Sequence, residues 1–225
     1  SFPVLVYSTT GLAVVGKGIL KIKAADSSNF VRNFSFEIDN NEDNIPDAWK
    51  PYVKGFEYDT SGANAKSGTS SVYCKNDSLT EFRGIYISIP INQEKPEELK
   101  LSGWSKCNNV SGSKDNDYSL YVDCIYNDNT PLYGQTAQFS TGTHDWEYSE
   151  QIIKPEKPIK SLNLYALFRK HTGEVWFDHI SLEKYIPSDI SNTSPNIRCF
   201  DLDINSNPGG ENSYAVLTAF DEGKI

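Results

Sequence analysis

Residues 161–185 read SLNLYALFRKHTGEVWFDHISLEKY and hold two apolar-alternating segments joined by a His-Thr-Gly turn. Between residues 162 and 168 the even positions are apolar, which is the period of a half-buried β-strand. Residues 175–182 continue as the second strand of a hairpin and carry Asp178 among aromatic and aliphatic neighbours. A buried carboxylate without a partner is costly, so we expect Asp178 to have one.

The rest of the chain repeats this pattern of short alternating segments between turn residues. The composition includes 13 Tyr, 15 Gly and 11 Pro, which favours strands and loops over helices. Eight or so strands are expected, among them NFSFEI (33–38), FRGIYISIPI (82–91), LKLSGWSKC (99–107) and DYSLYVDCIY (117–126). Such a series predicts an all-β fold, an antiparallel β-sandwich with short flanking segments.

Six short motifs occur in one order along the chain. They are Asn-Phe-x-Phe-Glu at 33–37, Pro-x-x-Trp at 46–49, Ser-Gly at 67–68, LSGW at 101–104, Asp-Trp at 145–146, and Gly-x-x-Trp-Phe-Asp-x-Ile-x-Leu at 173–182. In this order they resemble the jelly-roll carbohydrate-binding modules of families four, nine and twenty-two, which are galactose-binding-domain-like sandwiches. The resemblance covers residues 31–185.

Three segments follow from this. Residues 1–30 are expected to be N-terminal strands or the end of a preceding module, 31–185 the carbohydrate-binding-like sandwich, and 186–225 a Pro/Ser/Asn linker and the start of a further segment. The chain begins with Ser and contains no Met, as expected of a processed protein or a piece of a larger one. Other domains of a larger parent protein are therefore expected partners.

Charge and hydropathy narrow the other partners. The formal net charge is −9, which argues against nucleic acid, because phosphates select for clustered Lys and Arg. Apolar runs such as GLAVVG are far shorter than the ~20 residues that span a bilayer, so no membrane span is expected. The resemblance implies a secreted or cell-surface protein.

The resemblance also implies a structural calcium ion. It makes Glu37 and Asp178 neighbours through pairing of the first and last strands, and two adjacent carboxylates repel unless a cation lies between them. Calcium takes six to eight oxygens, and the resemblance implies that carbonyls from Lys66 to Thr69 supply some of them. The alternative is two surface acids that are solvated or paired with lysines.

Strand parity predicts a sugar-binding surface. Residues that alternate with the expected core positions share an outer face; the candidates are Trp104, Tyr121, Asp123, Tyr165 and Arg169, together with Lys106. Aromatic rings cover the apolar face of a pyranose while polar groups bond its hydroxyls. Two alternatives stay open: binding by end loops through Trp49, Tyr52 or Tyr133, or ion pairing of Arg169 and Lys106 with Asp123.

Catalytic motifs are weak. The acid pairs in FEID and FEYD do not fix the geometry of a glycosidase, the three histidines lack metal-ligand spacing, and there is no GxSxG or P-loop.

The cysteines show no CxxC, and a hairpin register would put Cys107 and Cys124 too far apart for a disulfide. The sequence predicts no enzyme but a non-catalytic, lectin-like module that binds a polysaccharide or glycoprotein glycan; the alternative is a protein-interaction or spacer module.

Overall fold

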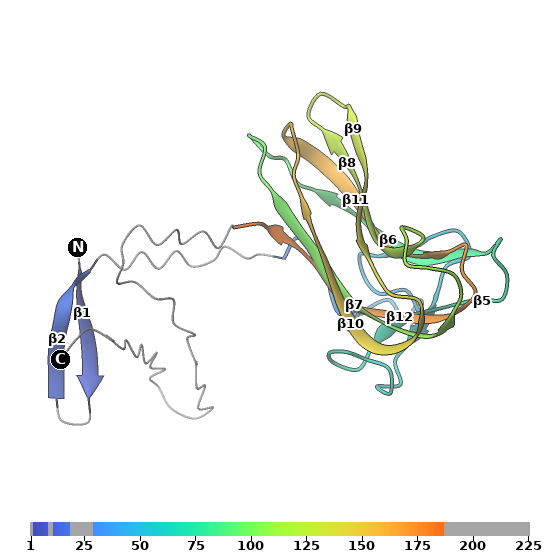
Figure 1. Ribbon diagram of the computed structural model, residues 1–225, viewed down its shortest axis with the longest axis horizontal. Helices are drawn as coiled ribbons and strands as arrows, with labels where there is room; N and C mark the ends of the chain where they lie inside the picture. Colours follow the sequence, from blue (N-terminus) through green and yellow to red (C-terminus); the bar gives the residue numbers. More distant parts are fainter. Residues whose placement is uncertain (1, 9–10, 19–28, 187–225) are drawn as a thin grey trace. The chain divides into compact units, whose positions relative to one another are not determined.

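The computed structural model describes residues 2–8, 11–18 and 29–186 (Figure 1). Within these residues all regular elements are β-strands, arranged in three antiparallel sheets. A two-stranded sheet pairs β1 (Phe2–Ser8) with β2 (Gly11–Gly18). The expected linker and further segment after residue 186 lie outside the described residues. No described helix has the length and hydropathy needed to cross a bilayer.

The second compact unit spans Asp26–Ile186 and contains two five-stranded sheets. The first, which we call the β8 sheet, has the order β3-β6-β11-β8-β9. The second, the β7 sheet, has the order β10-β7-β12-β5-β4. The strands are β3 (Lys50–Pro51), β4 (Glu57–Asp59), β5 (Ser71–Asn76), β6 (Phe82–Pro90), β7 (Leu99–Val110), β8 (Tyr118–Tyr126), β9 (Pro131–Gln138), β10 (Gly142–Ile153), β11 (Ile159–Arg169) and β12 (Gly173–Lys184).

The core lies between the two sheets and is built by the alternation seen in the sequence. On β8 and β11 the fully buried side chains include Leu120, Val122, Leu164 and Phe168, as the parity predicts. The β7 sheet faces them with residues such as Leu101, Cys107, Val175 and Phe177. The predicted antiparallel β-sandwich is confirmed.

LKLSGWSKC and DYSLYVDCIY do not form the hairpin that was assumed in comparing the positions of Cys107 and Cys124. The first segment is β7, which pairs with β10 and β12, whereas the second is β8, which pairs with β11 and β9. These two consecutive strands therefore belong to opposite sheets. Cys74, Cys107 and Cys124 are buried free thiols, and burial raises the pKa of the Cys124 thiol to about 12.

The expected strand NFSFEI is also wrong, because this segment is a turn. Asn33 and Phe36 have positive φ angles of 50° and 61°, and the Phe36 amide donates to the Asn33 carbonyl. The two phenylalanines have different environments: Phe36 is buried and packs against Trp49, whereas Phe34 is 39% exposed and its ring contacts His179 edge-on. The first and last segments of the sandwich nevertheless lie side by side as predicted, since the Ile180 amide donates to the Phe34 carbonyl.

Candidate functional site

Three tyrosines lie side by side across the outer face of the β8 sheet. Tyr165 on β11 is in register with Tyr86 on β6 and with Tyr121 on β8. The Tyr165 ring centroid lies 5.4 Å from that of Tyr86, in a stacked arrangement, and 6.2 Å from that of Tyr121, edge-on. All three side chains are half-buried, so the row presents aromatic surface to solvent across three adjacent strands.

The Arg169 guanidinium lies at one end of this row, against the Tyr121 ring. The Nε of Arg169 donates to Oδ1 of Asp117 at 2.5 Å, and one terminal nitrogen donates to the Tyr52 hydroxyl at 3.4 Å. The guanidinium lies 5.6 Å from the Tyr121 ring, and the Tyr52 ring contacts Tyr165 edge-on at 5.6 Å. Arg169 is thus paired with Asp117, not with Asp123 as the alternative supposed, and it orients two of the rings.

Polar groups lie beside the rings. Asp123 is half-buried on β8, and its Oδ1 accepts from the Gly134 amide at 3.1 Å, whereas its Oδ2 has no bonding partner among the described residues. Burial raises the pKa of Tyr165 and of Tyr121, and the charge of Asp123 raises both further. These phenols therefore stay neutral and can both donate and accept hydrogen bonds.

Two residues predicted for this face lie elsewhere. Trp104 and Lys106 are on β7, in the opposite sheet, where Trp104 pairs with Tyr148 and lies under the Lys66 amine at 3.8 Å. Lys106 donates to Asn64 rather than to Asp123. Their outward parity was predicted correctly, but parity along one strand does not say which of the two sheets that strand joins.

The sequence analysis missed Tyr86 entirely and placed Tyr52 only among the loop candidates. The alternation in FRGIYISIPI is a signal that could have found Tyr86, because Ile85 and Ile87 on either side are buried core residues. Of the other loop candidates, Trp49 is 4% exposed and donates to the Asn33 carbonyl, so it packs structurally. Tyr133 is 61% exposed on β9.

The two predicted metal-binding acids do lie at one loop. Oδ2 of Asp178 accepts from the amides of Lys66 and Ser67 at 2.7 and 2.8 Å, and its Oδ1 accepts from the His179 amide. The Glu37 carboxylate accepts from the Thr69 amide and hydroxyl and from the Ser70 amide. The loop at residues 66–70 thus presents N–H and O–H donors to both acids.

These contacts bear on the calcium prediction. A carboxylate offers about four acceptor positions, and each of these two acids already receives three donors. Calcium needs oxygen ligands, six to eight in all, whereas the loop contacts to the two acids are made by hydrogen-bond donors. The donors alone account for how both acids are held, so the geometry fits an amide-bound pair better than a calcium site. Calcium stays a prediction of the resemblance.

Asp178 is fully buried at this site. Burial raises its pKa to about 6; the three amide donors lower it, and the neighbouring charge of Glu37 raises it.

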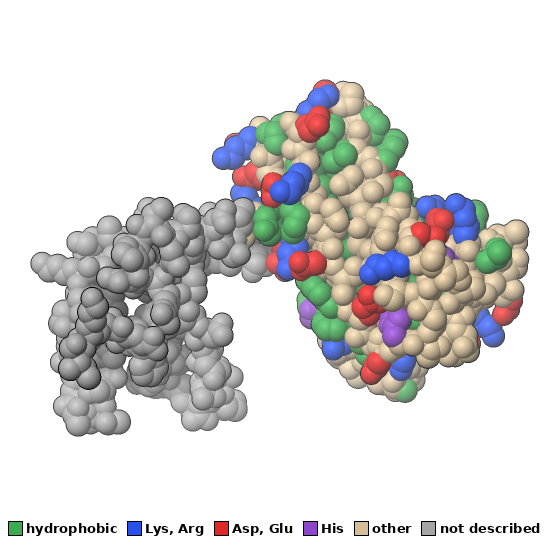
Figure 2. Space-filling model, in the orientation of Figure 1, with side chains coloured by type: hydrophobic (Ala, Val, Ile, Leu, Met, Phe, Trp, Pro, Cys, Tyr) green, Lys and Arg blue, Asp and Glu red, His purple; other side chains and the backbone are tan. Residues whose placement is uncertain are grey.

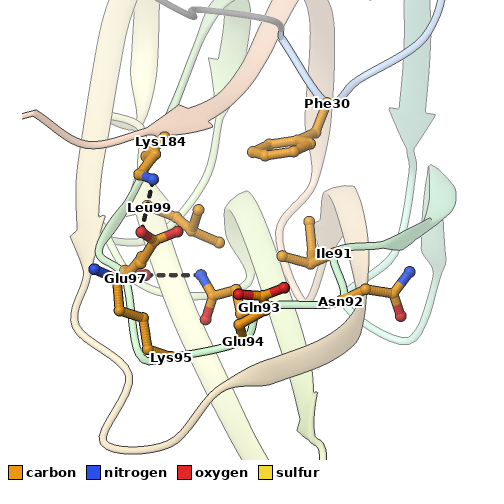
Figure 3. Close-up of a pocket in the computed structure, with 9 residues that line it drawn as sticks. All are labelled: Phe30, Ile91, Asn92, Gln93, Glu94, Lys95, Glu97, Leu99 and Lys184. Carbon is orange, nitrogen blue, oxygen red and sulfur yellow. Dashed lines mark hydrogen bonds and ion pairs between the residues drawn. The ribbon is translucent and has the colours of Figure 1, made fainter.

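A separate pocket of about 250 Å³ lies at one end of the sandwich, between the segment at 91–97 and the end of β12 (Figure 3). Three of its polar residues bond one another: the Lys184 amine contacts Glu97 at 2.7 Å, and the Gln93 amide donates to the Glu97 carbonyl. Phe30 and Ile91 supply its apolar wall. Its lining offers one aromatic side chain, Phe30, so the pocket is a weaker candidate for sugar stacking than the tyrosine row.

No family model matches the sequence. The chain is 33% identical over 164 residues to the tRNA nuclease WapA of Bacillus subtilis strain 168, and 32% identical to the tRNA3(Ser)-specific nuclease WapA of Bacillus spizizenii. The matched residues are 72% of this chain but 7% of each relative, so the chain spans a small part of the curated relatives it matches.

Two solved structures share the fold. One is the CBM22-1–GH10 part of the Clostridium thermocellum endo-1,4-β-D-xylanase 10B, complexed with xylohexaose; its TM-score is 0.52 at 17% identity, and the match covers 72% of this chain and 29% of that one. The other is the enzymatically active domain of tailspike protein 4 of bacteriophage CBA120, with a TM-score of 0.51 at 9% identity, covering 70% and 21%.

These relatives correct one prediction and conflict with another. The expectation of no enzyme is wrong in that the curated relatives are named as nucleases. The expectation of no nucleic-acid partner conflicts with the tRNA in those names. On the face shown in Figure 2, Lys and Arg side chains lie interspersed with Asp and Glu and do not form the cluster that phosphates select for. The described residues 29–186 have the jelly-roll β-sandwich fold of a carbohydrate-binding module, as the sequence motifs predicted.

Proposed function

We propose that the β8 sheet binds a glycan along the row Tyr86, Tyr165 and Tyr121. The observation that carries this proposal is the register of the three rings, which gives a continuous aromatic strip across three strands. A sugar ring stacks its apolar C–H face on such a strip, while its hydroxyls need polar partners at the side. Asp123 supplies an acceptor oxygen there, and the neutral phenols both donate and accept.

In this proposal the two charged residues predicted from the sequence have different roles. Asp123 faces the ligand with its unpaired oxygen and orients hydroxyls. Arg169 positions the rings. Its hydrogen bond to Asp117 holds the guanidinium in place, its hydrogen bond to Tyr52 fixes that side chain, and its contact with the Tyr121 ring fixes the other. Rings that are fixed before binding lose little conformational freedom on binding, which favours affinity.

The likeness to WapA supports a setting for this module. We propose that the chain is one part of a much longer extracellular protein with nuclease activity, and that the sandwich holds that protein on a glycan-bearing surface. A tethered domain acts at a raised local concentration on its target. The competing function, a protein-interaction or spacer module without sugar specificity, predicts no binding to any glycan.

A glycan array followed by titration tests the proposal. Tyr165→Ala should weaken binding to the selected glycan by about tenfold, because the central stacking ring is worth at least ~1.4 kcal/mol. Tyr165→Phe should retain most of the affinity, since it keeps the ring. Tyr133→Ala is the matched control: an exposed tyrosine of the same sheet, it should have no effect. A loss for Tyr133→Ala but not for Tyr165→Ala would move the site to the β9 edge of the sheet.

A further inference from the structure

The opposite face of the sandwich carries a second aromatic pocket. It has a volume of about 530 Å³ and lies on the outer side of the β7 sheet, between β4, β5, β12 and the loop at residues 60–64. Trp176 and Tyr73 contribute rings to it, and both are half-buried, while the alternating neighbours Val175 and Phe177 face the core. This pocket shares no residue with the tyrosine row.

The two rings are fixed in place at their polar ends. Trp176 on β12 is in register with Tyr73 on β5, and their centroids are 4.9 Å apart. The Tyr73 hydroxyl donates to Glu174 at 3.1 Å. The Asp59 carboxylate accepts hydrogen bonds from Ser61 and Asn64; burial tends to raise the pKa of Asp59, but hydrogen bonding lowers it overall. The pocket therefore offers pre-positioned rings.

The rim of the pocket provides an available acceptor. Glu57 on β4 is directly opposite Tyr73 in the sheet, is exposed, and makes no hydrogen bond or ion pair with the described residues. On the other side of Trp176, Lys106 is in register on β7, but its amine is bonded to Asn64 at 3.2 Å. One row of side chains across β4, β5, β12 and β7 thus consists of the Glu57 carboxylate, the Tyr73 phenol, the Trp176 indole and the Lys106 amine. The Lys106 amine is already hydrogen-bonded.

From this row we propose that the pocket is a second saccharide-binding site, selective for neutral sugars. The rings take the apolar face of a pyranose, and Glu57 accepts its hydroxyl hydrogens. The lining includes Glu57 and Asp59 but no Lys or Arg, so uronic acids, sulfated sugars and phosphates are repelled. A cationic ligand is disfavoured too, because the Lys106 amine already lies 5.7 Å from the Trp176 ring.

The volume agrees with a ligand of this kind. Small-molecule sites commonly measure ~300–1,000 Å³, and about 530 Å³ lies within that range. The pocket is independent of the proposed site on the β8 sheet, since the two faces are separated by the hydrophobic core. A chain with both sites would engage two glycan strands, or two parts of one, on opposite sides of the sandwich.

Calorimetric titration of the full chain with neutral oligosaccharides, namely xylohexaose, cellohexaose and chitohexaose, tests this inference, with an oligogalacturonate as the acidic comparison. We expect two sites per chain for at least one neutral sugar and none for the oligogalacturonate. Trp176→Ala should remove one site. Glu57→Ala, an exposed change that leaves the core intact, should weaken the same site severalfold. Tyr165→Ala should weaken only the other site, by about tenfold.

The outcomes separate the two proposals. Loss of all binding in Tyr165→Ala, with Trp176→Ala and Glu57→Ala like the parent, overturns the second site and leaves the first. Loss in Trp176→Ala but not in Tyr165→Ala overturns the first and supports the second. No binding of any of the three neutral sugars would overturn the second site. Binding of the oligogalacturonate or of oligolysine that Trp176→Ala abolishes would also overturn it.

Discussion

The Tyr165 ring stacks on the Tyr86 ring, with centroids 5.4 Å apart and 29° between the planes. This contact joins β11 to β6 on the outer face of the β8 sheet, and Tyr121 extends it to β8. Strands lie ~4.8 Å apart, so three of them carry an aromatic strip about 10 Å wide. A strip of that width favours an oligosaccharide chain over a single sugar as the proposed ligand.

Neighbouring residues on β8 should separate binding from stability. Tyr121→Ala should weaken glycan binding at least severalfold while the protein still melts near the parent temperature, because the ring is on the outer face. Leu120→Ala should cost ~2–5 kcal/mol of unfolding free energy, because Leu120 is fully buried. Thermal melting and glycan titration of both variants check this. A core-like melting loss for Tyr121→Ala would contradict the assigned outer face.

The acceptor role of Asp123 predicts a graded loss. Asp123→Ala should lower glycan affinity about tenfold, since hydrogen bonds to a charged group are worth ~1.5–3 kcal/mol. Asp123→Asn keeps one oxygen for the Gly134 amide and should lose less. Titration against the glycan selected by the parent protein measures both. Parent-like affinity for Asp123→Ala would exclude a ligand-facing role for this residue.

The sequence was sufficient to predict which faces of β8 and β11 point inward, because apolar alternation along a strand is a local property that burial alone explains. It was not sufficient to predict which strands share a sheet. Trp104 and Tyr121 both face outward, yet they lie on opposite sheets because the chain crosses the sandwich between β7 and β8. That choice depends on long-range pairing with β10 and β11, which no local pattern reports.

The backbone contacts of Glu37 and Asp178 could not be predicted from the sequence either. The proximity of Glu37 and Asp178 followed from the family motifs, but the contacts that hold them are amide donors from residues 66–70. Such donors leave no side-chain signature in a sequence. Likewise NFSFEI alternates like a strand although Asn33 and Phe36 adopt positive φ angles. The turn buries Phe36 but leaves Phe34 39% exposed, so apolar alternation alone does not distinguish a turn from a strand.

Asp178 should make stability depend on pH. Its folded pKa of about 6 lies above the ordinary value of 3.8, so the folded state binds more protons between those values. The Asp178 contribution to stability is therefore fully present below about pH 4 and falls as pH rises to about 6, by on the order of 2–3 kcal/mol. Denaturant unfolding of the parent and Asp178→Asn from pH 4 to 7 isolates this contribution. A difference between the two that is constant with pH would contradict the raised pKa.

Melting in calcium and in chelator tests the ion that the resemblance implies. Because amide donors already hold both acids, we expect the parent to melt at the same temperature in calcium and in chelator. Glu37→Gln should lose ~1–2 kcal/mol of unfolding free energy under either condition, because the Gln amide group presents a donor to the donors of Thr69 and Ser70. An ion bound only by the folded state would instead raise the parent's melting temperature. A calcium-dependent rise that Glu37→Gln removes would establish the metal site.

Gly68 should be the least replaceable glycine of the loop at residues 60–70. A Cβ built on it would lie 2.4 Å from the Cδ and Oε1 atoms of Glu37, and its φ is +65°. Gly68→Ala should therefore combine left-handed strain of ~1–2 kcal/mol with the loss of the Glu37 hydrogen bonds. Denaturant unfolding should show a loss larger than strain alone.

Gly62→Ala is the matched control, since its φ of +76° imposes similar strain but no atom lies within 4 Å of the position that its Cβ would take. The excess loss for Gly68→Ala over Gly62→Ala measures the displacement of the Glu37 carboxylate. In a Glu37→Ala background this excess should disappear, because no carboxylate remains to be displaced and the two variants then share only strain. An excess that persists in that background would mean that Gly68 is constrained by something other than Glu37, and that the close approach of the carboxylate to this loop does not decide its stability.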